Sequence, residues 1–175
     1  MVRKPLAAVL LGIALMLVTL LSPTAAQAGP NGQYYPYVNS TTHTCITGIG
    51  QYNHQLTASN CTGSGGQLWS LSTNTRSCCG YVYHQIINLN SGMCIGVRYG
   101  STSSGAAVVE GGCYEANDQY WAIIYTGQYS NGEALFIMAN WGSGKCIRPV
   151  GGGGVSLEQN NCDKTGRLWG NSYAV

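Results

Sequence analysis

Hydrophobic and polar residues alternate over short stretches of the chain, and clusters of Gly, Asn and Ser separate these stretches. Runs of about four to eight residues with frequent turn signals predict β-strands. After residue 28, no segment keeps a helical period over the roughly 11 to 18 residues that indicate a helix. The pattern therefore predicts an all-β domain of roughly twelve strands. The clearest strands cover residues 34–38, 55–58, 81–89, 107–110, 120–125, 134–139, 155–158 and 168–173.

A longer pattern occurs three times: Cys-Ile, a Gly-rich middle, a second Cys and a closing Trp. The copies cover residues 45–69, 94–121 and 146–169, with first cysteines 49 and 52 residues apart and closing tryptophans 52 and 48 apart. Val38-Asn39 and Ile87-Asn88 each begin seven residues before the first Cys, and residues 137–140 match more loosely. A fixed period indicates a repeated supersecondary unit. We expect a closed three-fold domain with repeats over approximately residues 35–78, 79–126 and 127–175.

The first 28 residues have the layout of a secretory signal peptide. Arg3 and Lys4 precede an uncharged apolar run over residues 6–21, and the small-residue site Ala26-Gln27-Ala28 follows. The alternative is an uncleaved membrane anchor, since the run is only a little shorter than the roughly 20 residues that span a bilayer. Pro23 and the cleavage site favour removal, which leaves a domain over residues 29–175. Such a start is typical of a secreted bacterial protein, and no other segment could span a membrane.

The charge balance changes once this segment is set aside. The formal charge of +2 comes from Arg3 and Lys4, so residues 29–175 carry six basic and six acidic side chains. A surface of near-zero net charge has no basic patch to neutralise phosphates. We therefore expect no nucleic-acid partner.

All eight cysteines follow the predicted signal peptide, and an even number in that setting indicates disulfides formed in an oxidising compartment. Cys78 and Cys79 lie outside the repeated pattern. The alternatives for them are a vicinal disulfide, a disulfide with a partner's thiol, or free thiols. We expect no metal site, because no second Cys or His cluster lies at ligand spacing. The three copies predict the pairs Cys45–Cys61, Cys94–Cys113 and Cys146–Cys162.

The three copies end in similar tripeptides: Gln67-Leu68-Trp69, Gln119-Tyr120-Trp121 and, with Gln replaced, Arg167-Leu168-Trp169. These ends resemble the ricin B-type lectin family, whose repeats close with Gln-x-Trp and pack as a β-trefoil. The likeness covers residues 35–173, and it implies a β-trefoil of three repeats, here each with an internal disulfide. We expect the three tryptophans to fill the core where the repeats meet, and Gln67 to satisfy buried backbone groups.

In this family a sugar pocket has an Asp two residues after the first Cys, an aromatic residue two before the second Cys, and a polar residue before Gln-x-Trp. The carboxylate accepts hydrogen bonds from sugar hydroxyls and the ring covers an apolar face of the sugar. This chain departs from that pattern in every copy. The Asp position holds Thr47, Gly96 or Arg148, and the aromatic position holds Ser59, Gly111 or Asn160.

Other side chains offer similar chemistry in a different arrangement. In the second copy, Tyr99 is the candidate for stacking, and Asp118 and Gln119 are candidates for hydrogen bonding to a sugar. Tyr52, Tyr114 and Trp141 are further aromatic residues close to the copies in sequence. The second candidate pocket is in the third copy, where the residues would suit an acidic ligand: Arg148, Glu158 and Asn160.

Catalysis is not expected. Glycan hydrolysis needs two facing carboxylates, and a surface position accounts for Glu110 and Asp118, which share a copy. His43, His54 and His84 have no nucleophile signature beside them. We expect a secreted, extracellular, non-catalytic lectin-like module without cofactors, which binds extracellular or cell-wall glycans through several weak sites. The alternative is a protein-interaction module, such as an accessory subunit or toxin partner, that has lost sugar binding.

Overall fold

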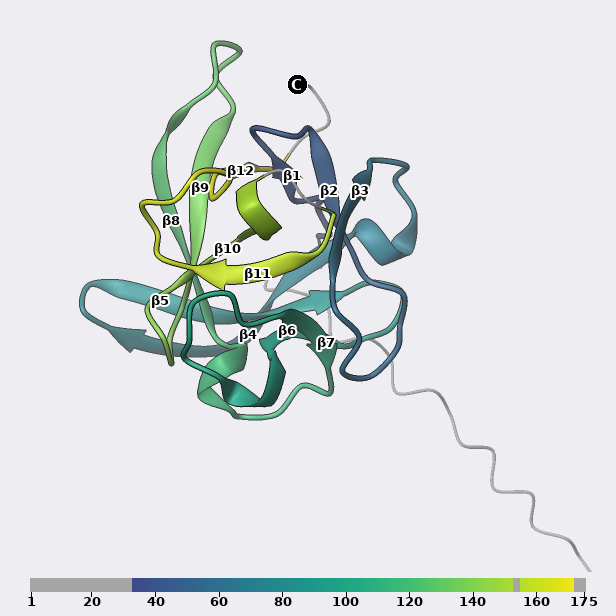
Figure 1. The fold of residues 1–175 in the computed structure, drawn as a ribbon, viewed down its shortest axis with the longest axis vertical. Coiled ribbons are helices and arrows are strands. Elements are labelled where there is room, and N and C mark those ends of the chain that lie inside the picture. The colour runs from purple at the N-terminus through teal and green to yellow at the C-terminus, as the bar shows by residue number, and fades with distance from the viewer. Residues whose placement is uncertain (1–32, 153–154, 172–175) are drawn as a thin grey trace, which may run out of the picture.

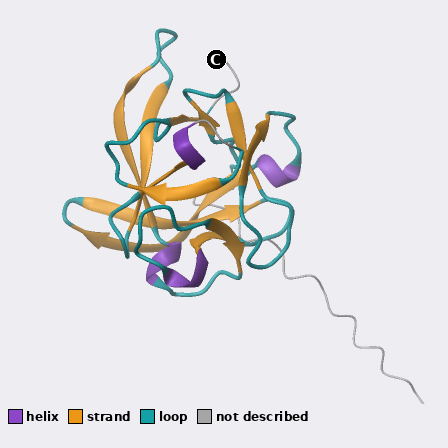
Figure 2. Cartoon of the chain, viewed as in Figure 1, coloured by secondary structure: helices purple, strands orange, loops and turns teal. Residues whose placement is uncertain are grey.

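The computed structural model describes residues 33–152 and 155–171, which form twelve strands and four single-turn 3-10 helices (Figures 1 and 2). The strands are β1 (Val38–Asn39), β2 (Thr44–Thr47), β3 (Thr57–Asn60), β4 (Trp69–Cys78), β5 (Tyr81–Asn88), β6 (Cys94–Val97), β7 (Val108–Gly111), β8 (Trp121–Gln128), β9 (Ala134–Asn140), β10 (Cys146–Pro149), β11 (Leu157–Asn160) and β12 (Trp169–Gly170). The 3-10 helices are η1 (Gly65–Gln67), η2 (Arg98–Gly100), η3 (Asn117–Gln119) and η4 (Val150–Gly152). The predicted all-β class and strand number are confirmed. The predicted signal peptide lies outside the described residues.

Six strands close into a barrel. β1 pairs with β12, β12 with β9, β9 with β8, β8 with β5 and β5 with β4. The ring closes where Tyr35 and Trp69 exchange two backbone hydrogen bonds, both of 2.9 Å. A closed barrel leaves no unpaired sheet edge along its wall.

The other six strands form three hairpins, β2–β3, β6–β7 and β10–β11, that join one another beside the barrel (Figure 1). Single bridges between the hairpins connect all three in pairs, and this arrangement confirms the predicted β-trefoil. Two barrel hairpins, β4–β5 and β8–β9, project away from this assembly (Figure 1). The bridging pairs are Gln55–Val109, Thr57–Ser156 and Ala107–Glu158.

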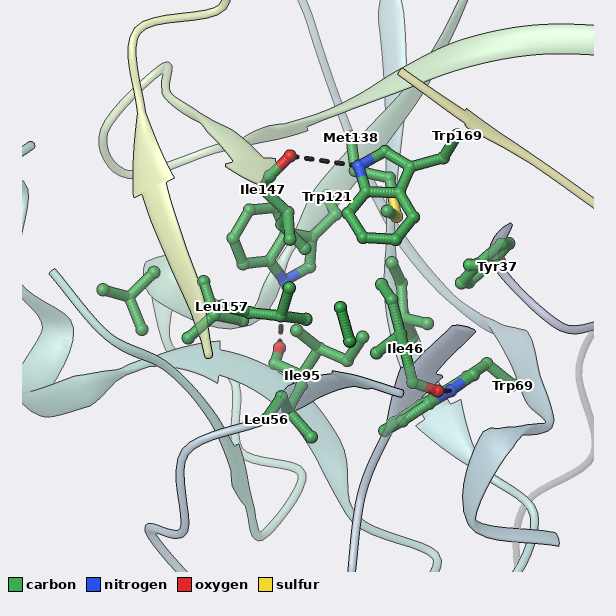
Figure 3. Close-up of a cluster of buried hydrophobic side chains, with 14 of the residues drawn as sticks. Tyr37, Ile46, Leu56, Trp69, Ile95, Trp121, Met138, Ile147, Leu157 and Trp169 are labelled. Atoms are coloured by element: carbon green, nitrogen blue, oxygen red, sulfur yellow. Dashed lines mark hydrogen bonds between the residues drawn. The ribbon is translucent and has the colours of Figure 1, made fainter. Parts of the chain in front are cut away.

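The closing tryptophans make the same contact three times in the core (Figure 3). All three are fully buried, and each indole Nε1 donates to the carbonyl oxygen of the Ile that follows the first Cys of its copy. A buried indole N–H needs such a partner. The pairs are Trp69–Ile46 at 3.0 Å, Trp121–Ile95 at 2.9 Å and Trp169–Ile147 at 3.0 Å.

Tyr37 and Phe136 complete the core beside these rings. Their ring centroids are 5.7 Å apart in an edge-to-face arrangement, a geometry that aromatic quadrupoles favour. Burial raises the pKa of the Tyr37 hydroxyl well above its usual range, because ionisation would place a charge in the core.

An asparagine ahead of each copy links it to the copy before. Each side-chain Nδ2 donates to the carbonyl of the residue before the Gln-x-Trp position. Each Oδ1 accepts from the backbone N–H groups of the second and third residues after the Asn. Asn140 lies six residues before Cys146, the same spacing as Asn39 and Asn88, so the third match is closer than the sequence pattern indicated. The donor–acceptor pairs are Asn39–Gly166 at 2.6 Å, Asn88–Gly66 at 3.0 Å and Asn140–Asp118 at 2.8 Å.

The three disulfides predicted from the copies are present: Cys45–Cys61, Cys94–Cys113 and Cys146–Cys162. Of the alternatives for Cys78 and Cys79, the structure has the vicinal disulfide. It lies at the exposed tip of the β4–β5 hairpin, where Cys79 and Gly80 have φ of 57° and 82° and form the two-residue turn. Left-handed conformations at both positions are typical of tight hairpin turns.

Four strands were not predicted from the sequence. Three are the short strands that contain the first Cys of each copy, β2, β6 and β10, whose Thr, Gly, Arg and Pro residues weaken the strand pattern. The fourth, β4, is rich in Ser, Thr and Asn because its outer half lies in the projecting hairpin and faces solvent. Alternation of buried and exposed side chains, on which the prediction relied, fails where neither face is covered.

Candidate functional site

The second copy has a cavity of about 220 Å³, and the three residues predicted to bind sugar there, Tyr99, Asp118 and Gln119, all line it. Tyr52 from the first copy and Tyr114 from the second line it too. The floor comes from β6 and β7, including Gly96 and Gly111. Residues far apart in sequence therefore meet in one hollow beside η3.

Three tyrosines surround this cavity and expose most of their side chains. The exposed fractions are 68% for Tyr52, 89% for Tyr99 and 60% for Tyr114. Tyr99 has a left-handed backbone, with φ of 57°. The Tyr114 ring covers Gly112, where a Cβ atom would lie 2.8 Å from the ring. Exposed aromatic rings around a hollow are typical of surfaces that stack on a ligand.

The Asp118 carboxylate lies next to Gly96, which holds the position of the family's Asp but has no side chain. A Cβ atom at Gly96 would lie 3.0 Å from Asp118 Oδ2, so the carboxylate fills the space where a side chain at position 96 would begin. Oδ2 also accepts a hydrogen bond of 3.2 Å from the Val97 backbone N–H. The carboxylate therefore reaches the pocket from η3 instead of from β6.

Gln119 supports the pocket rather than offering its amide to a ligand. Its side chain is buried, Oε1 accepts from Tyr114 N at 2.7 Å and Nε2 donates to Gly112 O at 2.6 Å. Gln67 makes equivalent bonds in the first copy, to Thr62 N and Asn60 O. The prediction for Gln67 as a structural residue describes Gln119 equally well, and we assign Gln119 to the frame that holds Tyr114.

Glu110 does not have the surface position that the sequence analysis expected. Its side chain is fully buried, Oε2 accepts from Gly50 N at 2.8 Å and Oε1 accepts from Ser91 Oγ at 3.0 Å. A Cβ atom at Gly48 would lie 2.4 Å from this carboxyl group. A buried carboxylate needs such partners, and Glu110 joins the first copy to the second.

In the predicted pocket of the third copy, the charged side chains bind each other. Arg148 forms an ion pair of 2.8 Å with Glu158 and donates to Thr165 O at 3.2 Å, and Asn160 Nδ2 donates to Glu158 Oε1 at 3.2 Å. The three residues thus lie together and bind one another. Glu158 offsets the charge of Arg148, which weakens the case for an acidic ligand at this place.

The first copy uses the same positions for packing. Thr47 Oγ1 accepts from Gln67 Nε2 at 3.0 Å, so it is part of the frame. A Cβ atom at Gly66 would lie 2.5 Å from the Gly48 carbonyl oxygen, and no side chain fits where the second copy has Asp118. The polar positions of the first copy are therefore internal to the fold.

Residues 33–152 and 155–171 contain no group of three His, Cys, Asp or Glu residues placed to hold a metal ion. None of the helices in that part of the chain is long and apolar enough to cross a membrane. Of the histidines, His84 lies 3.0 Å from the Ser72 carbonyl through Nδ1.

Comparison with known proteins agrees with this geometry. Residues 66–152 match the family described as ricin-type β-trefoil lectin domain-like. No curated protein matches the sequence.

Solved structures give the same fold at low identity. The designed three-fold symmetric protein ThreeFoil has a TM-score of 0.65 at 19% identity, over 78% of this chain and 95% of its own. An exo-β-1,3-galactanase from Clostridium thermocellum has a TM-score of 0.65 at 20% identity, over 81% of this chain and 30% of its own. The Polyporus squamosus lectin, bound to a human-type influenza-binding epitope, has a TM-score of 0.59 at 16% identity, over 82% and 48%. The chain thus spans less than half of the last two proteins.

Proposed function

Because the chain belongs to the ricin-type β-trefoil lectin family, we propose that it is a secreted, non-catalytic module that binds glycans through the cavity of its second copy. One observation carries the proposal: the Asp118 carboxylate lies beside Gly96 in a hollow that three exposed tyrosines surround. A carboxylate that accepts from hydroxyl groups and aromatic rings that cover an apolar face suit the recognition of a sugar. Four disulfides support secretion, since they form in oxidising compartments.

The chemistry of the pocket fits binding without catalysis. Hydrolysis of a glycosidic bond needs two carboxyl groups on either side of it. Glu110 is the second carboxylate that lines the cavity, but it is fully buried and bonded to Gly50 and Ser91. Asp118 can accept hydrogen bonds from sugar hydroxyls. The exposed tyrosine rings can cover an apolar face of the sugar.

The proposal is tested by a glycan array with the oxidised protein, followed by calorimetric titration of the strongest ligand. We expect Tyr99→Ala and Asp118→Asn each to weaken binding about ten-fold or more, which is the loss of a stacked ring or of a hydrogen bond to a charged group. Asn at position 118 keeps an acceptor for Val97 N, so the fold is retained.

Matched variants at exposed positions serve as controls. Tyr81→Ala removes an exposed tyrosine from the tip of the β4–β5 hairpin, and Asp163→Asn removes an exposed carboxylate from the third copy. Both are expected to bind as the unchanged protein does. A folded protein that binds no glycan would contradict the proposal and favour the protein-interaction alternative.

A further inference from the structure

A second hollow of about 290 Å³ adjoins the tyrosine-lined cavity, and the two share Gly100 and Asp118 as lining residues. Its other walls include Ser101 and Thr102 after η2, and Asn117 at the start of η3. No aromatic ring lines it. Asp118 thus lies at the boundary between an aromatic hollow and a polar one.

The sizes of the two hollows indicate that one ligand fills both. Ligand sites usually measure about 300 to 1,000 Å³, and each hollow, at about 220 and 290 Å³, is smaller than that. Together they fall within the usual range. A single sugar ring stacked on a tyrosine would leave the polar hollow to water.

The charges of the lining residues define the ligand further. Neither hollow has a Lys, Arg or His among its lining residues, whereas the first has two carboxylates, Glu110 and Asp118, and the second has Asp118. An acidic sugar would meet an uncompensated negative charge at the boundary. Neutral hydroxyl groups can donate to Asp118 and can exchange hydrogen bonds with Ser101, Thr102 and Asn117.

The polar hollow is held in place by Arg76 of the β4–β5 hairpin. The Arg76 guanidinium donates to Asn117 Oδ1 and to the Glu115 carbonyl, the latter at 2.7 Å. It also stacks over the Tyr120 ring, 4.1 Å from the centroid, with Trp141 beside it at 5.9 Å. The amide of Asn117 is therefore fixed before a ligand arrives, and a pre-organised group loses little entropy on binding.

We infer that the binding site extends across Asp118 and takes a neutral oligosaccharide of at least two sugar residues. One residue stacks on the tyrosines and the next hydrogen bonds in the polar hollow, in which Arg76 acts as a positioning residue. The inference rests on the proposed function and adds the length and charge of the ligand to it.

The test is a titration of the oxidised, ¹⁵N-labelled protein followed by NMR. The probes are galactose, β-1,3-galactobiose and β-1,3-galactotriose, the corresponding xylose series, and lactose with sialyllactose as a neutral and acidic pair. We expect the amide signals of Tyr99 and Tyr114 to shift with every neutral ligand that binds. Those of Ser101, Thr102 and Asn117 should shift only with ligands of two or more residues.

Affinity is expected to rise by roughly five-fold for each hydrogen bond gained in the polar hollow. Thr102→Val and Asn117→Ala should remove this gain, and Thr41→Val, which changes an exposed threonine ahead of the first copy, should have no effect. Arg76→Gln should reduce oligosaccharide affinity and shift the Asn117 side-chain amide signals even without ligand.

The outcomes separate the two proposals. Equal affinity for mono- and trisaccharides, with Thr102→Val silent, would overturn the extended site and leave the proposed function standing. Tighter binding of sialyllactose than of lactose would overturn the neutral class. Failure of every probe and every array glycan to bind would overturn both proposals.

Discussion

The Asp118 side chain both holds the backbone of β6 and presents a carboxylate to the pocket. Its Oδ2 accepts from Val97 N, where the first copy has the Gly66 carbonyl accepting from Gly48 N at 2.9 Å. In the second copy a side-chain carboxylate thus replaces a backbone carbonyl as the hydrogen-bond acceptor. The same carboxylate also reaches the pocket. The exchange is possible because Gly96 leaves room for it.

This pairing predicts that a carboxylate cannot simply be restored at position 96. In Gly96→Asp the new Cβ would lie 3.0 Å from Asp118 Oδ2 and 3.1 Å from Gln119 Cγ. Crowding of this kind typically costs about 1 to 3 kcal/mol, and the like charges add to it. Urea denaturation should show a lower midpoint for the variant.

The double variant Gly96→Asp, Asp118→Gly is the control for this prediction. It moves the carboxylate to the family's position and places at 118 the residue that the first copy has. We expect it to recover at least about 1 kcal/mol of the loss, a coupling within the usual range for residues in contact. Additive effects of the two changes would show that Asp118 does not occupy the space beside Gly96.

The sequence predicted candidate residues for the pocket, but it did not predict how residues of different copies come together there. Asp118 was a candidate because it holds the family's polar position before Gln-x-Trp, and Tyr99 because it is an aromatic residue of the same copy that could replace the missing one. Tyr52 belongs to another copy, and only the contact between hairpins, such as the bridge between Gln55 and Val109, brings it to the pocket. Burial of Glu110 also depends on folded neighbours, and no local signal distinguishes it from a surface residue. Gln119, by contrast, has the Gln-x-Trp position that predicted a structural role for Gln67.

At the scale of elements, the disulfides divide into two kinds. Three disulfides each connect the first strand of a hairpin to the loop after its second strand, across 16 to 19 residues. They are Cys45–Cys61, Cys94–Cys113 and Cys146–Cys162. The vicinal pair, by contrast, closes no loop and lies in the exposed turn of β4–β5. The copies revealed the first kind, whereas the turn that brings Cys78 and Cys79 to a hairpin tip was not predicted.

This difference predicts unequal effects on stability. Replacing Cys94 and Cys113 by Ser should lower the free energy of unfolding by about 3 kcal/mol, because a loop of that length gains roughly this much entropy in the unfolded chain. Replacing Cys78 and Cys79 by Ser removes no such constraint, and the thermal midpoint should stay nearly unchanged. Differential scanning calorimetry of both variants makes the comparison.

A chemical measurement checks the same prediction in the unchanged protein. Mild reduction followed by alkylation and mass spectrometry should label Cys78 and Cys79 first, because they are exposed, while the thermal midpoint is maintained. Labelling of Cys45 or Cys94 before them, or a large loss of stability in the Cys78, Cys79 variant, would contradict the division of roles.

At the scale of the whole molecule, stability comes from contacts between copies. The barrel pairs β4 with β5, β8 with β9 and β12 with β1, so strands of neighbouring repeats share its wall. Asn39, Asn88 and Asn140 each bond to the copy before, with the first bonding to the third. A period near 50 residues predicted a closed three-fold domain, and these bonds show why no copy is complete without the others.

Glu110 gives the strongest test of this cooperation, because its carboxylate bonds the first copy at Gly50 and the start of the second at Ser91. Glu110→Ala would leave Gly50 N without an acceptor and a void beside Gly48, so we expect a loss of about 2 to 4 kcal/mol. If the copies form one cooperative unit, tryptophan fluorescence and backbone circular dichroism should still report one coincident transition at the lower midpoint. Two separate transitions would show that the first copy unfolds independently. Glu115→Ala, an exposed carboxylate of the same copy, is the matched control and should leave the midpoint within about 0.5 kcal/mol of the unchanged protein.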